Sequence, residues 1–268
     1  MNGSTVVLTG ATSGIGEAAA RLFAATAGRL IIHGPESQNR VAPLLTALSS
    51  AGRAELHYVR ADFDDLDQVV SLAARIRELT DTVDVLVNNA GRPGAERRTV
   101  SRNGYEATLQ TNYLAAVLLT RHLATVLPSP DGRVVHVASA THRSVTLDLE
   151  DISLERDYSP VRAYATSKLA MVAHAITQAE EWRPEGPQIV SISPGVINTR
   201  LLHAMFAVHG AAPEHGAKNL VDAATRSIPI SGGYIDDGHP AEPSAQVRDP
   251  AFRRRLHTVT SRLLADWM

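Results

Sequence analysis

The sequence Thr9-Gly10-Ala11-Thr12-Ser13-Gly14-Ile15-Gly16 follows a short β-branched run and leads directly into a helical stretch. Three glycines at such a junction allow the backbone to turn tightly, to approach a pyrophosphate and to pack the helix against the strand. The free N–H groups at the start of that helix then face the phosphates. The spacing is G-x-x-x-G-x-G, and its place after the first strand of a βαβ series favours a dinucleotide-binding loop over an ordinary tight turn.

The rest of the chain alternates β-branched runs with longer amphipathic runs, a pattern typical of βαβ units and a parallel sheet. We expect strands at Thr5–Thr9, Arg29–His33, Glu55–Arg60, Val83–Asn88, Arg133–Ala138, Gln188–Ser193 and Tyr234–Ile235. We expect helices at Ile15–Ala27, Val41–Ala51, Leu66–Thr80, Gly104–Leu127, Arg162–Glu181, Glu214–Ser227 and Pro250–Trp267. The predicted fold class is therefore α/β. We expect a single Rossmann-type doubly wound domain over residues 1–268, with a mostly parallel sheet of about seven strands and helices on both faces.

Composition excludes several function classes. The 268 residues carry a formal net charge of −2, so no polycationic surface is predicted for nucleic acid or anionic lipid. The absence of cysteine excludes disulfides, thiolate catalysis and thiolate metal sites. His203, His209 and His215 recur at six-residue intervals, which fit no zinc motif, so no metal site is predicted. No apolar run approaches ~20 residues and Met1-Asn2-Gly3-Ser4 does not begin a signal peptide, so we expect a cytoplasmic protein without a membrane partner.

A phenol and an ammonium group lie four residues apart in Tyr164-Ala165-Thr166-Ser167-Lys168, on one face of an expected helix. A phenol has a reference pKa of about 10 and is a poor base at neutral pH. A neighbouring lysine and a cationic nicotinamide both favour the phenolate, and we expect them to lower the pKa of Tyr164 by ~3 units. Tyr164 could then exchange a proton with a substrate oxygen while hydride moves at the adjacent carbon.

Three other polar residues are candidates for the same site. Ser139 follows the run Val134–Val137, and its hydroxyl either holds a substrate carbonyl or belongs to an ordinary strand-exit loop. Asp62 follows the third strand and either accepts a hydrogen bond from an adenine amino group or caps the next helix. Asn112 is a mediocre helix former inside a helical stretch, so we expect it to contact backbone or water.

Together these residues resemble the short-chain dehydrogenase/reductase family over essentially the whole chain. The resemblance rests on the order and spacing of the glycine loop, Asp62, Asn88-Asn89-Ala90-Gly91, Asn112, Ser139, Tyr164 with Lys168, and Pro194-Gly195 with Thr199. It implies a catalytic set of Asn112, Ser139, Tyr164 and Lys168, in which the asparagine holds a water that links the lysine to solvent. It also implies that the cofactor contacts are Gly10, Ser13, Gly14, Ile15, Gly16, Asp62, Asn88, Ala90, Gly91, Tyr164, Lys168, Pro194, Gly195 and Thr199.

Two features resemble one branch of that family, which contains retinol dehydrogenases, WW-domain oxidoreductases and protochlorophyllide reductases. The segment between Ser139 and Tyr164 is longer than usual and includes Asp148–Asp157, and the tail from Gly232 to Pro250 is similar to that branch. The membrane anchor common among the retinol enzymes is not found in this sequence, which weakens an inference to a retinoid substrate.

Cofactor choice is expected to depend on the end of the second strand, His33-Gly34-Pro35-Glu36. An acid there would bind the ribose 2′-hydroxyl of NAD, and an arginine would pair with the 2′-phosphate of NADP. Gly34 and Pro35 stand at the two informative positions, and Ser13 is neutral. Glu36, Ser37 and Arg40 are close but ambiguous. With no acid at the strand tip, and because the related branch often uses NADP, the prediction favours NADP(H) over NAD(H).

The predicted function is therefore NAD(P)-dependent hydride transfer between nicotinamide and a carbonyl/alcohol substrate. Two alternatives remain open: reduction of a C=C bond at the same site, and a non-catalytic dinucleotide-sensing or scaffold protein on the same fold. Residues of about 200–230 are expected to form a substrate lid, whose apolar side chains suit a hydrophobic substrate or a packed domain edge. The family suggests a homodimer or homotetramer built from the Gly104–Leu127 and Arg162–Glu181 helices.

Overall fold

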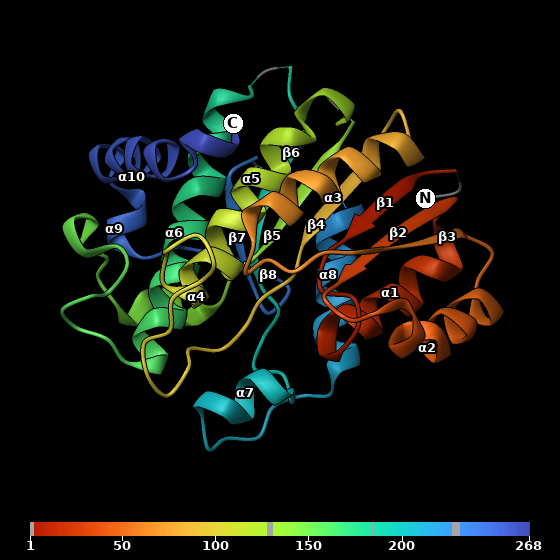
Figure 1. Ribbon diagram of the computed structural model, residues 1–268, viewed down its shortest axis with the longest axis horizontal. Helices are drawn as coiled ribbons and strands as arrows, with labels where there is room; N and C mark the ends of the chain where they lie inside the picture. The colour runs from red at the N-terminus through yellow and green to blue at the C-terminus, as the bar shows by residue number, and fades with distance from the viewer. Residues whose placement is uncertain (1–2, 128–130, 184, 227–230) are drawn as a thin grey trace.

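The sheet is wound in both directions from β1, as a dinucleotide-binding fold requires. In the computed structural model (Figure 1), which describes residues 3–127, 131–183, 185–226 and 231–268, the strand order is β3-β2-β1-β4-β5-β6-β7-β8. The strands are β1 (Thr5–Leu8), β2 (Arg29–Gly34), β3 (Glu55–Arg60), β4 (Val85–Asn88), β5 (Arg133–Val137), β6 (Gln188–Ser193), β7 (Gly233–Asp236) and β8 (His239–Ala241). The predicted α/β class and single domain with a mostly parallel sheet are confirmed.

One strand more is present than the seven expected. The extra strand, β8, is three residues long and pairs antiparallel with β7, whereas all other neighbouring strands are parallel. Its central residue is Pro240, and proline is tolerated in a sheet at an edge strand such as this one. This segment is rich in proline and glycine, a composition that does not predict a strand.

Strand residues alternate between the two faces of the sheet, and helices cover both. In β1, Val6 and Leu8 join the hydrophobic cluster under α1 and α8, while Val7 joins the cluster under α3, α5 and α6. The helices are α1 (Gly14–Thr26), α2 (Gln38–Ala51), α3 (Leu66–Leu79), α4 (Ala107–Leu109), α5 (Ala115–His122), α6 (Pro160–Glu181), α7 (Arg200–Met205), α8 (Pro213–Thr225), α9 (Ala245–Arg248) and α10 (Pro250–Leu263). Burial on both faces explains why the strands are nearly continuous apolar runs.

The expected helix Gly104–Leu127 is interrupted. It begins at Ala107, where the Glu106 carboxylate accepts hydrogen bonds from the amides of Thr108 and Leu109. A π-helical turn then occupies Gln110–Leu114 before regular helix resumes in α5. Such π turns are rare and often mark functional sites. This one contains Asn112.

The helix α10 covers α5 and α6 on the side away from the sheet. Every residue of α6 from Ala163 to Ala175 is buried, so this helix has no face open to a second subunit. Contacts from α10 include the hydrogen bond between Tyr113 and Thr260 hydroxyls and the Arg253–Glu180 ion pair. Residues of α10 thus lie on the outer surface of α6, and the dimer or tetramer expected through these helices stays a prediction.

Only part of the expected lid stands apart from the body of the molecule. Helix α7 projects below the sheet in Figure 1, whereas α8 packs on α1 and buries Ala217 and Leu220 in the core. The second half of the expected lid is thus a helix of the main domain, and Ser227, with the other lid residues up to 230, lies outside the described residues. Among the described residues, no helix is both long and apolar enough to cross a membrane.

Candidate active site

A cavity of about 1250 Å³ lies at the carboxyl ends of the parallel strands. Its walls come from the segments at the ends of seven strands of the sheet and from α7, which is where open α/β sheets bind ligands. At one end lies the glycine loop after β1, and at the other lie Ser139, Tyr164 and Lys168. The volume exceeds the 300–1,000 Å³ typical of a site for one small ligand, and it offers room for a dinucleotide together with a substrate.

The glycine loop is shaped by close backbone contacts. Gly10 has a φ of +63°, and a Cβ added there would lie 2.6 Å from the Cα of Ala90. A Cβ at Gly16 would collide with the carbonyl oxygen of Gly10. The Asn89 side chain holds the loop by donating hydrogen bonds to the carbonyls of Thr9 (2.9 Å) and Gly10 (3.0 Å). Glycine is therefore required at positions 10 and 16 for the loop to form.

A buried histidine beneath the loop contributes to its shape and was missed in the sequence. The Nδ1 atom of His33 accepts a hydrogen bond from the Gly10 amide (3.3 Å), so Nε2 carries the proton and donates to the Ala61 carbonyl (3.0 Å). The ring stacks on Phe63 at 4.4 Å. Burial lowers the pKa of His33 to about 4, so the ring stays neutral and keeps accepting from the loop. In sequence it is one residue of an apolar strand, with no signal of this role.

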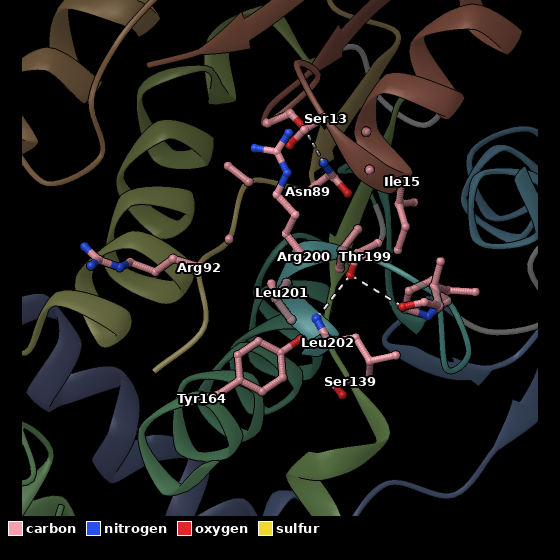
Figure 2. Close-up of a pocket in the computed structure, with 18 of the residues that line it drawn as sticks. Ser13, Ile15, Asn89, Arg92, Ser139, Tyr164, Thr199, Arg200, Leu201 and Leu202 are labelled. Atoms are coloured by element: carbon pink, nitrogen blue, oxygen red, sulfur yellow. Dashed lines mark hydrogen bonds between the residues drawn. The ribbon is translucent and has the colours of Figure 1, made fainter. Parts of the chain in front are cut away.

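Tyr164 and Lys168 lie on adjacent turns of α6 and both line the cavity. Figure 2 shows the Tyr164 ring beside Ser139 at the cavity wall. The Lys168 Nζ atom lies 5.5 Å from the centre of the Tyr164 ring and donates a hydrogen bond to the Val137 carbonyl at 2.7 Å. Ser139 follows β5 and its hydroxyl accepts from the Thr141 amide. The structure thus brings three of the four expected catalytic residues together.

Burial is the largest influence on the pKa values of Tyr164 and Lys168. It raises the pKa of Tyr164 to about 12, opposed by a hydrogen bond with the Ser139 hydroxyl, and it lowers the pKa of Lys168 to about 8. The lower pKa expected from the sequence includes the attraction of a cationic nicotinamide and stays a prediction for the complex; in the protein alone, the loss of water around the phenol is the larger effect. The protein by itself holds Tyr164 as a protonated phenol.

The fourth expected catalytic residue, Asn112, lies behind the cavity wall. Its Oδ1 accepts from the Arg92 amide at 2.7 Å, and its Nδ2 donates to the Arg92 carbonyl and to the Ser167 hydroxyl, both at 3.0 Å. A Cβ added at Gly91 would lie 3.3 Å from Asn112 Oδ1 and 3.6 Å from Lys168 Nζ. The asparagine side chain therefore ties the strand-exit turn after β4 to α6, and its amide is satisfied by protein groups.

The expected cofactor residues line the cavity with one exception. The residues that do so are Gly10, Ser13, Gly14, Ile15, Gly16, Asp62, Ala90, Gly91, Tyr164, Lys168, Pro194, Gly195 and Thr199. The exception is Asn88, whose buried amide donates to the Thr120 hydroxyl at 2.9 Å and lies near His136 Nδ1. The cofactor contact expected of Asn88 is corrected to its neighbour Asn89, because successive strand residues point to opposite faces. Asp62 also caps its own turn, its Oδ1 accepting from the Asp64 amide.

Glu36 and Arg200 are two of the charged cavity residues that were not among the expected contacts. Glu36 lines the cavity beyond β2, and among the described residues its buried Oε2 atom has no hydrogen-bond partner. The Arg200 side chain extends toward the glycine loop at Ser13 in Figure 2. A carboxylate can accept a hydrogen bond from a ligand hydroxyl, and a guanidinium beside the glycine loop can pair with a phosphate. The two side chains therefore fit a ligand that carries both groups, such as a dinucleotide.

The remaining wall, over the tyrosine end, is apolar. Thr199 caps α7 by accepting from the Leu202 amide at 3.2 Å (Figure 2), and its methyl lies 3.3 Å from where a Cβ of Gly14 would be. The chain beyond it contributes the cavity-lining side chains Leu201, Leu202, Met205, Phe206 and Val208. His203 and His209 of the same segment do not line the cavity but contact each other edge to face.

The glycine loop and the tyrosine–lysine pair in one cavity define a dinucleotide-binding oxidoreductase of the Rossmann type. The family model for short chain dehydrogenase matches residues 4–208, and the chain belongs to this family, whose members bind NAD or NADP. The class and family predicted from the sequence are confirmed.

Curated relatives match over nearly the whole chain. A candidate daunorubicin C-13 ketoreductase of Streptomyces sp. (strain C5) is 32% identical, with 98% of this chain and 93% of the relative covered. The polyprenol dehydrogenase of Mus musculus is 32% identical, with 97% of this chain and 84% of the relative covered. The human retinol dehydrogenase 13 is 28% identical, with 98% of this chain and 85% of the relative covered. The predicted likeness to the retinol dehydrogenase branch is confirmed. A solved structure from Mycobacterium paratuberculosis superposes with a TM-score of 0.80 at 26% identity, covering 98% of this chain and 93% of that one.

Proposed function

We propose that this protein reduces a ketone or aldehyde to an alcohol with a nicotinamide dinucleotide, and that Tyr164 is the general acid. The observation that carries the proposal is the convergence of Ser139, Tyr164 and Lys168 on the cavity that also contains the glycine loop. The bound dinucleotide supplies the hydride. The Ser139 hydroxyl and the Tyr164 phenol are the donors at the place where the substrate oxygen gains charge.

The protonation of the pair favours reduction. A phenol whose pKa is about 12 is fully protonated at neutral pH and can give its proton to the substrate oxygen. Charged Lys168, 5.5 Å from the ring, stabilises the phenolate that this transfer leaves. The reverse reaction needs the phenolate at the outset, so alcohol oxidation is expected to require a higher pH.

For the cofactor we propose NAD(H), which reverses the preference drawn from the sequence. Glu36 supports this choice, because its carboxylate lines the cavity beyond β2, where it suits a ribose 2′-hydroxyl donor and repels a 2′-phosphate. The basic residue nearest to it along the sheet, Arg60, donates to the Pro35 carbonyl and is not part of the cavity wall. At the other end of the dinucleotide, Arg200 is placed to pair with the diphosphate.

The substrate proposed is bulky and largely apolar around its carbonyl. The cavity wall formed by α7 and the following loop supports an apolar substrate, because five of the side chains that line it are aliphatic, thioether or aromatic. The names of the relatives point the same way: a ketoreductase for daunorubicin, a polyprenol dehydrogenase and a retinol dehydrogenase.

The experiment is a set of three variants assayed with NADH and NADPH against a panel of aromatic and long-chain ketones and aldehydes. Tyr164→Phe should lower kcat by roughly 10²–10⁴-fold, the usual contribution of a general acid, with the affinity for reduced cofactor retained. Ser139→Ala should also lower kcat. Tyr105→Phe is the matched control, because its hydroxyl donates to the Leu263 carbonyl outside the cavity. Full turnover by Tyr164→Phe on a substrate that the wild type reduces would refute the proposed role.

A further inference from the structure

His142 is fully buried in the 3₁₀ turn Ala140–Ser144 that follows Ser139, and it does not line the cavity. Both nitrogens of its ring have backbone partners. The Nδ1 atom lies 2.7 Å from the Ser139 carbonyl oxygen, and Nε2 lies 3.2 Å from the Ser244 amide nitrogen. The amide can only donate, so Nε2 is the acceptor and the ring proton resides on Nδ1. His142 is thus a neutral bridge with one tautomer, running from Ser139 to the C-terminal segment.

The same turn has a second attachment to that segment. The next residue, Arg143, pairs with Asp236 at 2.6 Å and donates to the Glu242 carbonyl from Nε and Nη2. The His142 ring packs edge to face on Tyr234 at 4.9 Å, and the Arg143 guanidinium lies over the same ring at 5.0 Å. The loop that carries Ser139 is therefore fastened to the segment 234–244, which is more than 90 residues away in the sequence.

We propose that His142 is a positioning residue that fixes Ser139 relative to Tyr164, and that it does so only while its ring is neutral. The inference rests on the proposed function, in which Ser139 holds the substrate oxygen. The Ser139 carbonyl accepts a hydrogen bond from His142, and the Ser139 hydroxyl accepts one from the Thr141 amide. These two contacts fix the position from which the Ser139 hydroxyl reaches Tyr164. A small displacement of this hydroxyl disturbs the hydrogen bond to the reacting oxygen.

Protonation would break the bridge. A second ring proton on Nε2 would point at the Ser244 N–H, so two donors would face each other. The charged groups around the ring act in opposite directions: Arg143 disfavours its protonation and Asp236 favours it, while Tyr234 contributes an uncharged face. Burial is the largest effect and lowers the pKa of His142, so the bridge persists at neutral pH and is lost in acid.

Three variants separate the two halves of the bridge. His142→Ala removes both contacts. His142→Asn places an amide N–H near the Nδ1 position, and so restores a donor for the Ser139 carbonyl without a titrating ring. Ser244→Pro replaces the N–H that faces Nε2 with the proline Cδ, which cannot donate a hydrogen bond. Ser244 has a φ of −59°, which suits proline, and among the described residues its buried hydroxyl has no hydrogen-bond partner.

We expect His142→Ala to lower kcat roughly ten- to a hundredfold with KM for the cofactor unchanged, and His142→Asn to recover most of that loss. Ser244→Pro should lower kcat and abolish the acid limb of the kcat profile, because no N–H is left to face a second ring proton. His142→Asn should also lack that limb, because its side chain does not titrate. His57→Ala, at an exposed ion pair with Glu55, is the control. Far-UV dichroism and cofactor titration verify folding of each variant.

A wild-type kcat in His142→Ala would overturn the inference. So would a loss of kcat that His142→Asn does not relieve, combined with an acid limb that Ser244→Pro leaves unchanged. Ser139→Ala measured beside them separates the two proposals. If it retains full activity, the proposed role of Ser139 fails. If it is impaired while the His142 variants are not, only the bridge is refuted.

Discussion

The chain contains only two lysines among 26 basic residues, and one of them, Lys168, is buried in the active site. Burial lowers its pKa from 10.5 to about 8, which corresponds to about 3 kcal/mol at ~1.36 kcal/mol per pKa unit. An arginine could not undergo such a shift. The folded protein without cofactor therefore contains a charged group at neutral pH that destabilises it.

We expect Lys168→Met to stabilise the cofactor-free protein while abolishing most of its activity. The Met side chain removes the buried charge but leaves the Val137 carbonyl without its donor, which costs about 1 kcal/mol. The net gain in unfolding free energy at pH 7 is about 2 kcal/mol. The folded state has the lower pKa, so the wild type becomes relatively more stable as pH rises from 8 toward 10.5. At pH 9.5 about 1 kcal/mol of the lysine penalty remains, which is close to the cost of the lost hydrogen bond, so the advantage of the variant nearly disappears.

The assay is urea unfolding of both proteins at pH 7 and pH 9.5, each without cofactor. Tyr164 does not interfere: its pKa is about 12 when folded and about 10 when unfolded, and its partial ionisation in the unfolded state at pH 9.5 is the same for both proteins. Lys218→Met is the matched control, since the chain's other lysine is exposed and paired with Asp222. A variant that is less stable than the wild type at pH 7, or an advantage that does not change with pH, would refute the reasoning.

Three further predictions concern the cofactor, acid stability and assembly. Glu36→Gln should lower the preference for NADH over NADPH in Kd by roughly tenfold or more, because it removes the charge that repels a 2′-phosphate; an unchanged ratio argues against Glu36 as the selector. Buried His136 has its pKa lowered from 6.5 to about 4, so it binds fewer protons when folded and the wild type should lose about 2 kcal/mol from pH 7 to pH 5 at this site. His136→Gln should show a smaller loss in urea unfolding at the two pH values, and an equal loss would contradict this. Sedimentation velocity should give a monomer of 28.7 kDa, and a stable dimer would contradict the covered helix face.

The sequence was sufficient for most of the fold because it is periodic where the structure is regular. Short apolar runs predicted seven of the eight strands in the described residues. The glycine spacing predicted the phosphate loop, and the backbone is tightly packed at those glycines. Tyr164 and Lys168 could be paired because helix geometry alone puts positions i and i+4 together. Ser139 could join them because neighbouring parallel strands end at one edge of a sheet.

The rest depends on contacts that no local pattern contains. The π turn at Asn112 arises where that side chain is held by the backbone of Arg92, 20 residues earlier. The approach of Glu36 to the cavity depends on the turn after β2, where a Cβ at Gly34 would lie 2.8 Å from the Glu36 carboxylate. The high pKa of Tyr164 follows from tertiary burial. Each is a consequence of packing between distant segments, which a residue pattern does not encode.

The C-terminal helix completes the active site without touching the cavity. Tyr164 and Lys168 require an α6 that does not shift, and this helix is buried from Ala163 to Ala175. Where the family pairs such helices across a subunit interface, here α10 lies on them, with Leu256 buried and the Arg253 guanidinium bonded to Glu180. The segment before α10 also supplies the Ser244 amide that holds His142. One stretch at the end of the chain thus stabilises the positions of both Tyr164 and Ser139, so changes there should act on turnover through geometry and not through cofactor binding.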